Sequence, residues 1–94
     1  MGFKSEKAFQ NYVLKRLRLL PMSYWYKAND RTTAGIPDLI GCVRGTFVGI
    51  ELKVNSKTSR IQDYTIDRIN RAGGVSFVTT PESFEKDLLL LKRL

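Results

Sequence analysis

Two apolar segments separated by only two residues constrain the fold of this chain more than any other feature. Residues 36–43 and 46–54 are both dominated by apolar side chains, and only Arg44 and Gly45 lie between them. A two-residue connection that ends in glycine predicts a tight β-hairpin, although arginine is a less usual first turn residue than asparagine or aspartate. The loop also fixes the pairing register, so that Val43 faces Thr46 across the hairpin.

The segments on either side of the hairpin complete an α/β pattern of order α-β-β-β-α-β-α. Before the hairpin we expect a helix that starts at Glu6 after the capping residue Ser5 and is stopped by Pro21, then a strand over residues 24–28 and a loop over 29–35. After the hairpin we expect a loop over 55–58 and a second helix, which is capped by Ser59 or Thr58 and ended by Gly73-Gly74. A strand over 75–79 and a helix over 82–94 complete the chain. The β-α-β connection makes the third and fourth strands parallel, in a mixed sheet flanked by helices.

Length and composition predict one domain over residues 1–94 and exclude several kinds of chemistry. A chain of 94 residues is typical of a single domain. No apolar run approaches the roughly 18 residues that span a bilayer, and the N-terminus has no signal-peptide segment, so we expect a cytoplasmic protein without membrane contact. The sequence has no histidine and one cysteine, Cys42, which we expect to be a small core residue. Any chemistry must therefore come from carboxylates and lysines.

The positive charge of the chain is concentrated in its first two thirds. The net charge is +7, from sixteen Lys and Arg against nine Asp and Glu. Residues 1–62 hold eleven basic and four acidic side chains, whereas residues 63–94 hold five of each. Such a field favours a polyanion, either nucleic acid or an anionic membrane surface.

The hairpin register places two carboxylates opposite each other. With Val43 facing Thr46, Asp38 falls opposite Glu51, and directly opposed residues have Cβ atoms about 4.5–5.5 Å apart. Like charges this close repel each other, and a divalent cation such as Mg²⁺ resolves the conflict because it binds carboxylate oxygens. Lys53 lies two residues after Glu51 and therefore on the same face of the strand.

This group of residues suits the cleavage of a phosphodiester. Asp38 and Glu51 would hold Mg²⁺ or Mn²⁺, with the backbone carbonyl of Leu52 as a further ligand. The metal would acidify a water and offset charge on the phosphate. Lys53 would orient or deprotonate that water, or neutralise the developing charge.

The same residues resemble the active-site signature of the PD-(D/E)XK nuclease superfamily. Residues 35–39 (GIPDL) followed by residues 47–53 (FVGIELK) are most similar to the VRR-NUC (virus-type replication-repair nuclease) family. The resemblance implies a restriction-endonuclease-like fold and metal-dependent DNA cleavage. Compact viral and bacterial members are similar to Holliday junction resolvases, so it also implies branched DNA as substrate, a homodimer, and a bacterial or phage-encoded protein.

Two further residues match the family on weaker signals. Glu6 matches a glutamate of the first helix and would contribute to the metal site. A carboxylate at the positive end of a helix is also favourable without any metal. Gln62 matches a glutamine at the start of the helix after the motif, where it would hold a water or phosphate in catalysis.

Basic and aromatic residues near the motif are candidates for contact with nucleic acid. The basic candidates are Lys27, Arg31, Lys57 and Arg60. Trp25, Tyr24 and Tyr26 would stack bases, but alternation along a strand makes one of its two faces core by default.

Surplus leucines add an independent indication of a homodimer. Residues 88–91 are four successive leucines, which cover more than the stripe of about 100° that one core contact uses. Leu14, Leu19 and residues 28–33 would extend the contact. The alternative is a last helix that lies deep in a groove of its own domain.

Two rival functions fit the same composition. The first is a basic nucleic-acid-binding domain without catalysis, which would have no reason to keep Asp38, Glu51 and Lys53 in register. The second is a sequence-specific restriction-type nuclease, for which 94 residues leave little room for elements that read bases.

Overall fold

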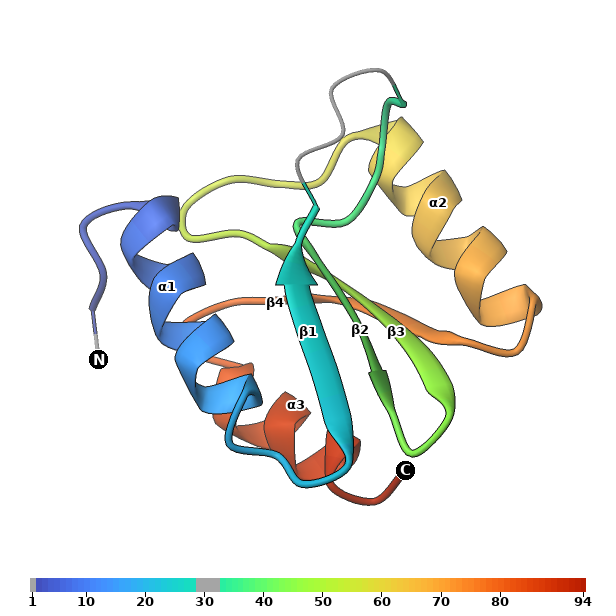
Figure 1. The fold of residues 1–94 in the computed structure, drawn as a ribbon. Coiled ribbons are helices and arrows are strands. Elements are labelled where there is room, and N and C mark those ends of the chain that lie inside the picture. The colour runs from blue at the N-terminus through green and yellow to red at the C-terminus, as the bar shows by residue number, and fades with distance from the viewer. Residues whose placement is uncertain (1, 29–32) are drawn as a thin grey trace.

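The β2–β3 hairpin is the centre of the sheet in the computed structural model of the chain, which describes residues 2–28 and 33–94. Strands β2 (Leu39–Val43) and β3 (Thr46–Leu52) are antiparallel. Strand β1 (Ser23–Lys27) pairs antiparallel with β2, and β4 (Val75–Thr79) pairs parallel with β3, which gives the sheet order β1-β2-β3-β4 (Figure 1). The predicted element order and mixed sheet are confirmed.

The turn of the hairpin has the geometry that the sequence predicts, at a cost. Arg44 and Gly45 both have positive φ, 48° and 88°, as a type I′ turn requires. A side chain with a Cβ adopts this conformation at a cost of roughly 1–2 kcal/mol. Val43 faces Thr46 and Leu39 faces Ile50, so the predicted register is confirmed.

Three helices complete the order, and two of them are shorter than predicted. They are α1 (Glu6–Leu17), α2 (Arg60–Arg71) and α3 (Phe84–Leu91). Helix α1 ends before Pro21 because the chain turns at Leu17, whose carbonyl accepts a hydrogen bond from Leu20 N at 3.0 Å, and this turn buries Leu20. Helix α3 starts later than residue 82 because Thr80 and Ser83 close a turn through reciprocal hydrogen bonds.

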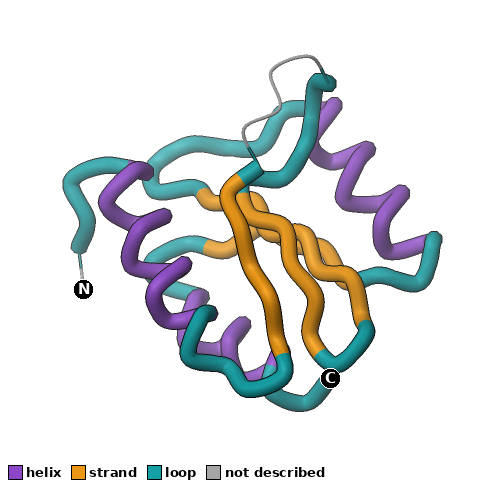
Figure 2. The backbone as a smooth tube through the Cα atoms, in the orientation of Figure 1, coloured by secondary structure: helices purple, strands orange, loops and turns teal. Residues whose placement is uncertain are grey.

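One face of the sheet carries the core. Alternate residues of the strands point to α1 and α3, which lie together on one side of the sheet, while α2 lies apart from them (Figures 1 and 2). The buried core residues of the sheet are Trp25, Leu39, Val43, Val48, Ile50 and Leu52. Tyr24, Tyr26 and Cys42 have the opposite parity and are exposed. The expectation that Cys42 is a core residue is therefore wrong.

Helix α2 is well capped but weakly buried. Ser59 is its cap, and the Ser59 hydroxyl and the Gln62 side chain bond each other's backbone N–H in a capping box. At the other end Gly73, with φ +96°, follows the last turn, and Gly74 N donates to Ile69 O at 3.0 Å. No residue of α2 is buried, although its apolar residues recur on one side.

Candidate active site

Asp38 and Glu51 lie together at the end of the sheet opposite to the hairpin turn. Asp38 directly precedes β2, and its carbonyl accepts a hydrogen bond from Ala28 N at 2.9 Å, which continues the β1–β2 pairing. Its carboxylate Oδ2 accepts from Leu52 N at 2.9 Å, so the side chain replaces the backbone pairing of the hairpin at this point. Glu51 is 2% exposed. The pairing thus brings the two predicted carboxylates side by side.

A polar cavity of about 620 Å³ contains this pair. It is bounded by the first half of α1, the ends of β1 and β3, the residue before β2, and the start of α2. The lining residues are Glu6, Lys7, Gln10, Lys27, Asp38, Glu51, Leu52, Lys53 and Gln62. The cavity brings together all six residues that the sequence predicts for catalysis or for the metal, namely Glu6, Asp38, Glu51, Leu52, Lys53 and Gln62.

The environment of Glu51 raises its pKa from 4.5 to about 8. Burial is the largest cause, because it disfavours the charged carboxylate. A hydrogen bond to the Asp38 side chain and the negative charge of Asp38 act in the same direction, as does the charge of Glu6. Lys53 opposes them. Without a cation, the site therefore relieves its internal repulsion by keeping a proton on Glu51.

Lys53 is held at the mouth of the site by its backbone. It directly follows β3, and its N–H donates to Thr79 O at 3.1 Å, which ties it to the end of β4. Its side chain is half-buried and lines the cavity with Glu51. The charge of Lys53 is therefore directed to the place where the carboxylates meet.

Gln62 and Glu6 reach the cavity from the two helices. Gln62 Oε1 accepts from Ser59 N at 2.8 Å, so its carbonyl is used in the capping box while the side chain lines the cavity. Glu6 is exposed in the first turn of α1. Gln62 therefore has a structural role in the capping box, and Glu6 is favourably placed at the positive end of α1. The metal and catalytic roles of these two residues stay predictions.

Of the basic residues predicted to contact nucleic acid, the structure places one in the cavity and two outside it. Lys27 lines the cavity, and its Nζ donates to Asn11 Oδ1 at 2.8 Å. Lys57 and Arg60 are exposed outside the cavity. Arg31 lies outside the described residues.

Two cavity residues, Lys7 and Gln10, were not predicted from the sequence. They lie in α1 one and four positions after Glu6. Residues four apart share a helix face. The position of Gln10 could therefore have been inferred from that of Glu6, whereas Lys7 is not marked by any spacing.

The donor set fits a hard divalent cation in part. In residues 2–28 and 33–94, no group of three or more carboxylate, cysteine or histidine side chains is arranged so that it could hold a metal ion. Mg²⁺ needs only one or two protein carboxylates, since waters complete its shell. Asp38 and Glu51 meet that requirement, because they place two carboxylates next to each other in a polar cavity.

One comparison with known proteins bears on the fold. The chain matches a solved structure described as a VRR_NUC domain, with a TM-score of 0.75 and 25% sequence identity, over 89% of this chain and 94% of that one. No protein-family sequence model and no curated protein matches the chain. This match supports a nuclease-family domain. The match supports membership of the VRR-NUC family, as the sequence signature predicts.

Replacing Glu51 with glutamine should stabilise the metal-free protein at alkaline pH. Folding raises the pKa of Glu51 from 4.5 to about 8, so the folded state binds more protons than the unfolded state between these values. Stability therefore falls as pH rises through this window, and Glu51→Gln removes that loss. In EDTA, we expect the Tm of the variant minus that of the parent to grow by about 5 °C or more from pH 5 to pH 9.

The control is Glu82→Gln, which changes an exposed glutamate in the turn before α3. Its Tm difference from the parent should stay constant over the same pH range. A constant difference for Glu51→Gln as well would show that Glu51 ionises normally.

Proposed function

We propose that this protein is a metal-dependent endonuclease that hydrolyses DNA phosphodiesters, with a preference for branched DNA such as four-way junctions. The observation that supports it best is the contact of buried Glu51 with Asp38 beside Lys53 in a polar cavity. A domain that only binds nucleic acid gains nothing from this arrangement, since it costs stability at neutral pH.

Asp38, Glu51 and the backbone carbonyl of Leu52 would hold the Mg²⁺ or Mn²⁺ ion. The ion, when bound, supplies Lewis-acid stabilisation of phosphate charge and lowers the pKa of water. Asp38 is fixed for this role because Leu52 N already holds one of its oxygens. Glu6, which is exposed at the cavity wall, would act through water rather than as a direct ligand.

Lys53 and Gln62 would act on the scissile phosphate and the attacking water. Lys53 stabilises negative charge as it develops on the phosphate, or takes a proton from the water. Gln62 has its Oε1 occupied by Ser59 N, so its side-chain NH₂ is the group left to donate to a phosphate or water oxygen.

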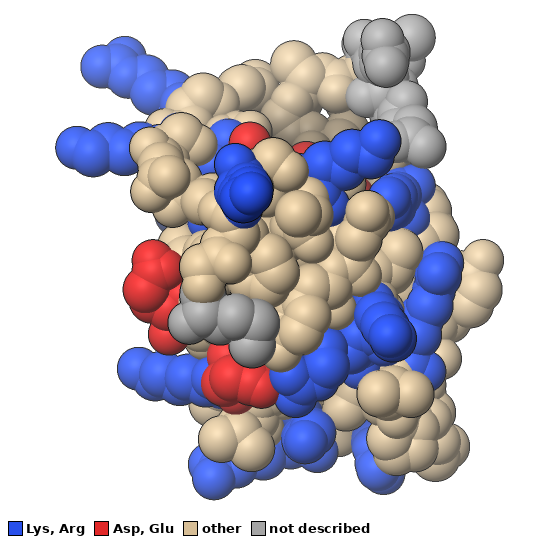
Figure 3. Space-filling model, turned by 90° about the vertical axis from the view of Figure 1, so that its left-hand side faces the viewer, with Lys and Arg blue, Asp and Glu red and all other residues tan. Residues whose placement is uncertain are grey.

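A basic surface beside the cavity would bind the DNA backbone. Lys and Arg side chains outnumber Asp and Glu on the face that carries α1 (Figure 3). Lys4, Lys7, Lys15 and Arg18 are exposed in and around this helix, and Lys7 also lines the cavity. Phosphate contacts of this kind dominate affinity without reading sequence, which favours selection of DNA by its shape.

A homodimer would supply the paired cuts that a four-way junction needs, since each chain has one site and a two-fold axis is the commonest symmetry. Of the leucines predicted for the contact, Leu19, Leu89 and Leu90 are exposed, at 76%, 58% and 54%. Leu14, Leu88 and Leu91 are buried in the chain's own core. Residues 29–32 of the predicted contact lie outside the described residues.

Asp38→Asn and Glu51→Gln should each lower DNA cleavage by about 100-fold or more, because each removes a charged oxygen from the metal site. Cleavage is to be measured with Mg²⁺ and with Mn²⁺ on linear duplex, flap and four-way junction DNA, with Glu82→Gln as the control.

A second measurement is the Tm of DNA-free protein. Mg²⁺ at about a hundredfold excess over its Kd should stabilise the parent by roughly 2–3 kcal/mol and neither variant. Full activity in both variants would contradict the proposal.

Lys53→Ala should lower the rate of cleavage at saturating DNA by about 100-fold while DNA affinity changes little, because a positioned charge near the phosphate is lost. The control is Lys86→Ala, an exposed lysine of α3 outside the cavity. Single-turnover rates and fluorescence anisotropy separate the two effects. A parental rate with weaker binding would reduce Lys53 to a phosphate contact.

Sedimentation at micromolar concentration should give twice the chain mass of 10.8 kDa. Replacing Leu89 and Leu90 with lysine should give a monomer, because both side chains are exposed on α3. Met22→Lys, which changes another exposed apolar residue, is the control. A mass near 10.8 kDa for the parent, with junction cleavage intact, would refute the dimer.

A further inference from the structure

A second cavity lies at the opposite end of the hairpin from Asp38 and Glu51. It has a volume of about 480 Å³ and is bounded by the last turn of α1, the segment that follows it, the β2–β3 turn and α3. Asp38 and Arg44 are six residues apart along β2, which corresponds to about 20 Å. A molecule bound here would leave the carboxylate cavity open.

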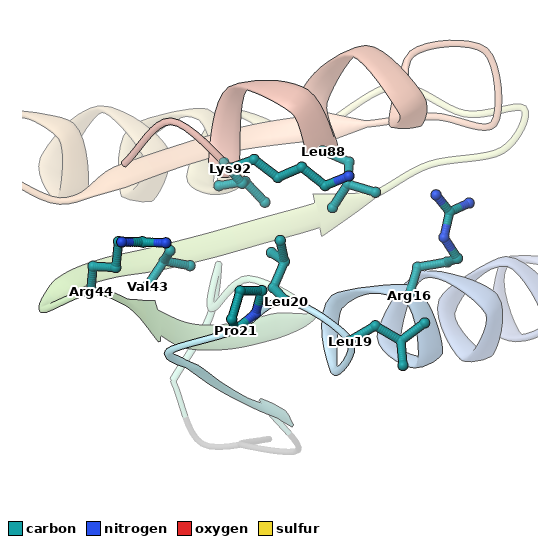
Figure 4. Close-up of a pocket in the computed structure, with 9 residues that line it drawn as sticks. Arg16, Leu19, Leu20, Pro21, Val43, Arg44, Leu88 and Lys92 are labelled. Atoms are coloured by element: carbon teal, nitrogen blue, oxygen red, sulfur yellow. The ribbon is translucent and has the colours of Figure 1, made fainter.

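This cavity, which we call the basic-rimmed hollow, combines an aliphatic floor with three cations. Arg44 and Arg16 lie at opposite ends of it and the Lys92 side chain extends between them along α3, while Leu20 and Pro21 lie on the other side (Figure 4). Among the described residues, none that lines it is acidic or aromatic. Leu20, Val43 and Leu88, at 8%, 2% and 4% exposure, are recessed below the cations.

The cations are unequally neutralised. Arg16 forms an ion pair with Glu85 at 2.8 Å and also donates to the Tyr12 hydroxyl at 2.6 Å. Among the described residues, no ion pair joins Arg44 or Lys92 to a carboxylate. The hollow therefore offers two uncompensated positive charges above an apolar floor.

The β2–β3 turn requires a left-handed backbone at Arg44, but it does not require arginine there. Arg44 occupies a left-handed position that asparagine would fill at lower cost. Met22, next to Pro21, is also left-handed with φ 55°, and its carbonyl accepts a hydrogen bond from Arg44 N at 2.9 Å. Of these two strained residues only Arg44 lines the hollow, and backbone strain of this kind clusters at ligand sites.

The chemistry of the hollow selects among anionic ligands. A phosphate backbone needs no recessed aliphatic floor, and bases stack on aromatic rings, which the hollow lacks. A lipid surface is bound by apolar side chains that protrude, whereas most of this floor is recessed. The volume lies within the range of small binding pockets and accommodates one or two large apolar side chains with carboxylates beside them.

We propose that the basic-rimmed hollow binds an acidic peptide segment of a partner protein, which places a large apolar side chain on Leu20, Val43 and Leu88 and its carboxylates on Arg44 and Lys92. Charge complementarity and the recessed floor both contribute to recognition. This interaction surface does not depend on the proposed nuclease activity.

The probe is a short fluorescein-labelled peptide in which a Leu-Phe pair lies among Asp and Glu residues. Its binding to the full chain is measured by fluorescence anisotropy. We expect binding in the micromolar range. The variant Arg44→Asn combined with Lys92→Gln should weaken it about tenfold or more. Asparagine suits the turn better than arginine, so Arg44→Asn alone should raise the Tm by about 4 °C, and loss of binding cannot then be ascribed to unfolding.

Two controls test the two components of recognition. Lys86→Gln removes an exposed positive charge of α3 outside the hollow and should leave the affinity unchanged. A peptide with serines in place of Leu-Phe should bind about tenfold more weakly or worse. Equal binding of the serine peptide would overturn the proposal in favour of bulk charge attraction.

Three other results would also overturn it. One is the absence of peptide binding at roughly 100 μM protein, a concentration well above the micromolar Kd that we expect for this site. The second is displacement of the peptide by a short single-stranded oligonucleotide whose own binding requires Arg44, which would identify a nucleic-acid site. The third is Arg44-dependent binding to phosphatidylserine vesicles at least as tight as binding to the peptide, which would identify a membrane contact.

Discussion

The pairing of β2 with β3 is the interaction on which the rest of this molecule depends. One register brings Leu39 opposite Ile50 within the core, and the next step along the same two strands brings Asp38 against Glu51. A slip by one residue would expose the core face of a strand, so the hydrophobic effect that stabilises the sheet also holds two carboxylates together. The repulsion of those carboxylates is small compared with the apolar burial that enforces it.

The parts of the site that lie on the hairpin were predictable from the sequence, because a two-residue turn converts residue numbers into spatial pairs. The pairing of Asp38 with Glu51 follows from that rule, and the position of Lys53 follows from alternation along the strand. Gln10 can be inferred only once Glu6 is placed at the site, and Lys7 cannot be inferred, since the approach of α1 to the sheet end is decided by the packing of Phe9 and Val13, which short-range patterns do not encode.

Two errors in the prediction have different origins. The periodicity of the first helix continues to Leu20, yet the helix ends at Leu17 and Leu20 is buried in the turn that follows, so tertiary packing overrides a pattern that is correct locally. Cys42 belongs to an apolar segment, but alternation along the strand directs it to the exposed side, and that alternation is itself a local pattern.

Helix α2 is attached to the sheet through few groups. Ile69 lies over Gly49 and Gly74, and the Asn70 side chain exchanges two hydrogen bonds with the Ser76 backbone, at 2.8 and 2.9 Å. Both attachments to the sheet are near the C-terminal end of the helix, whereas its first turns carry the capping box and lie against the loop at Gly35. Elements with little buried surface open at a lower free energy than the core. We therefore expect the first turn of α2, which carries Gln62, to exchange its amide hydrogens earlier than the strands that carry Asp38 and Glu51. One side of the carboxylate cavity is then rigid, and the other is able to adapt.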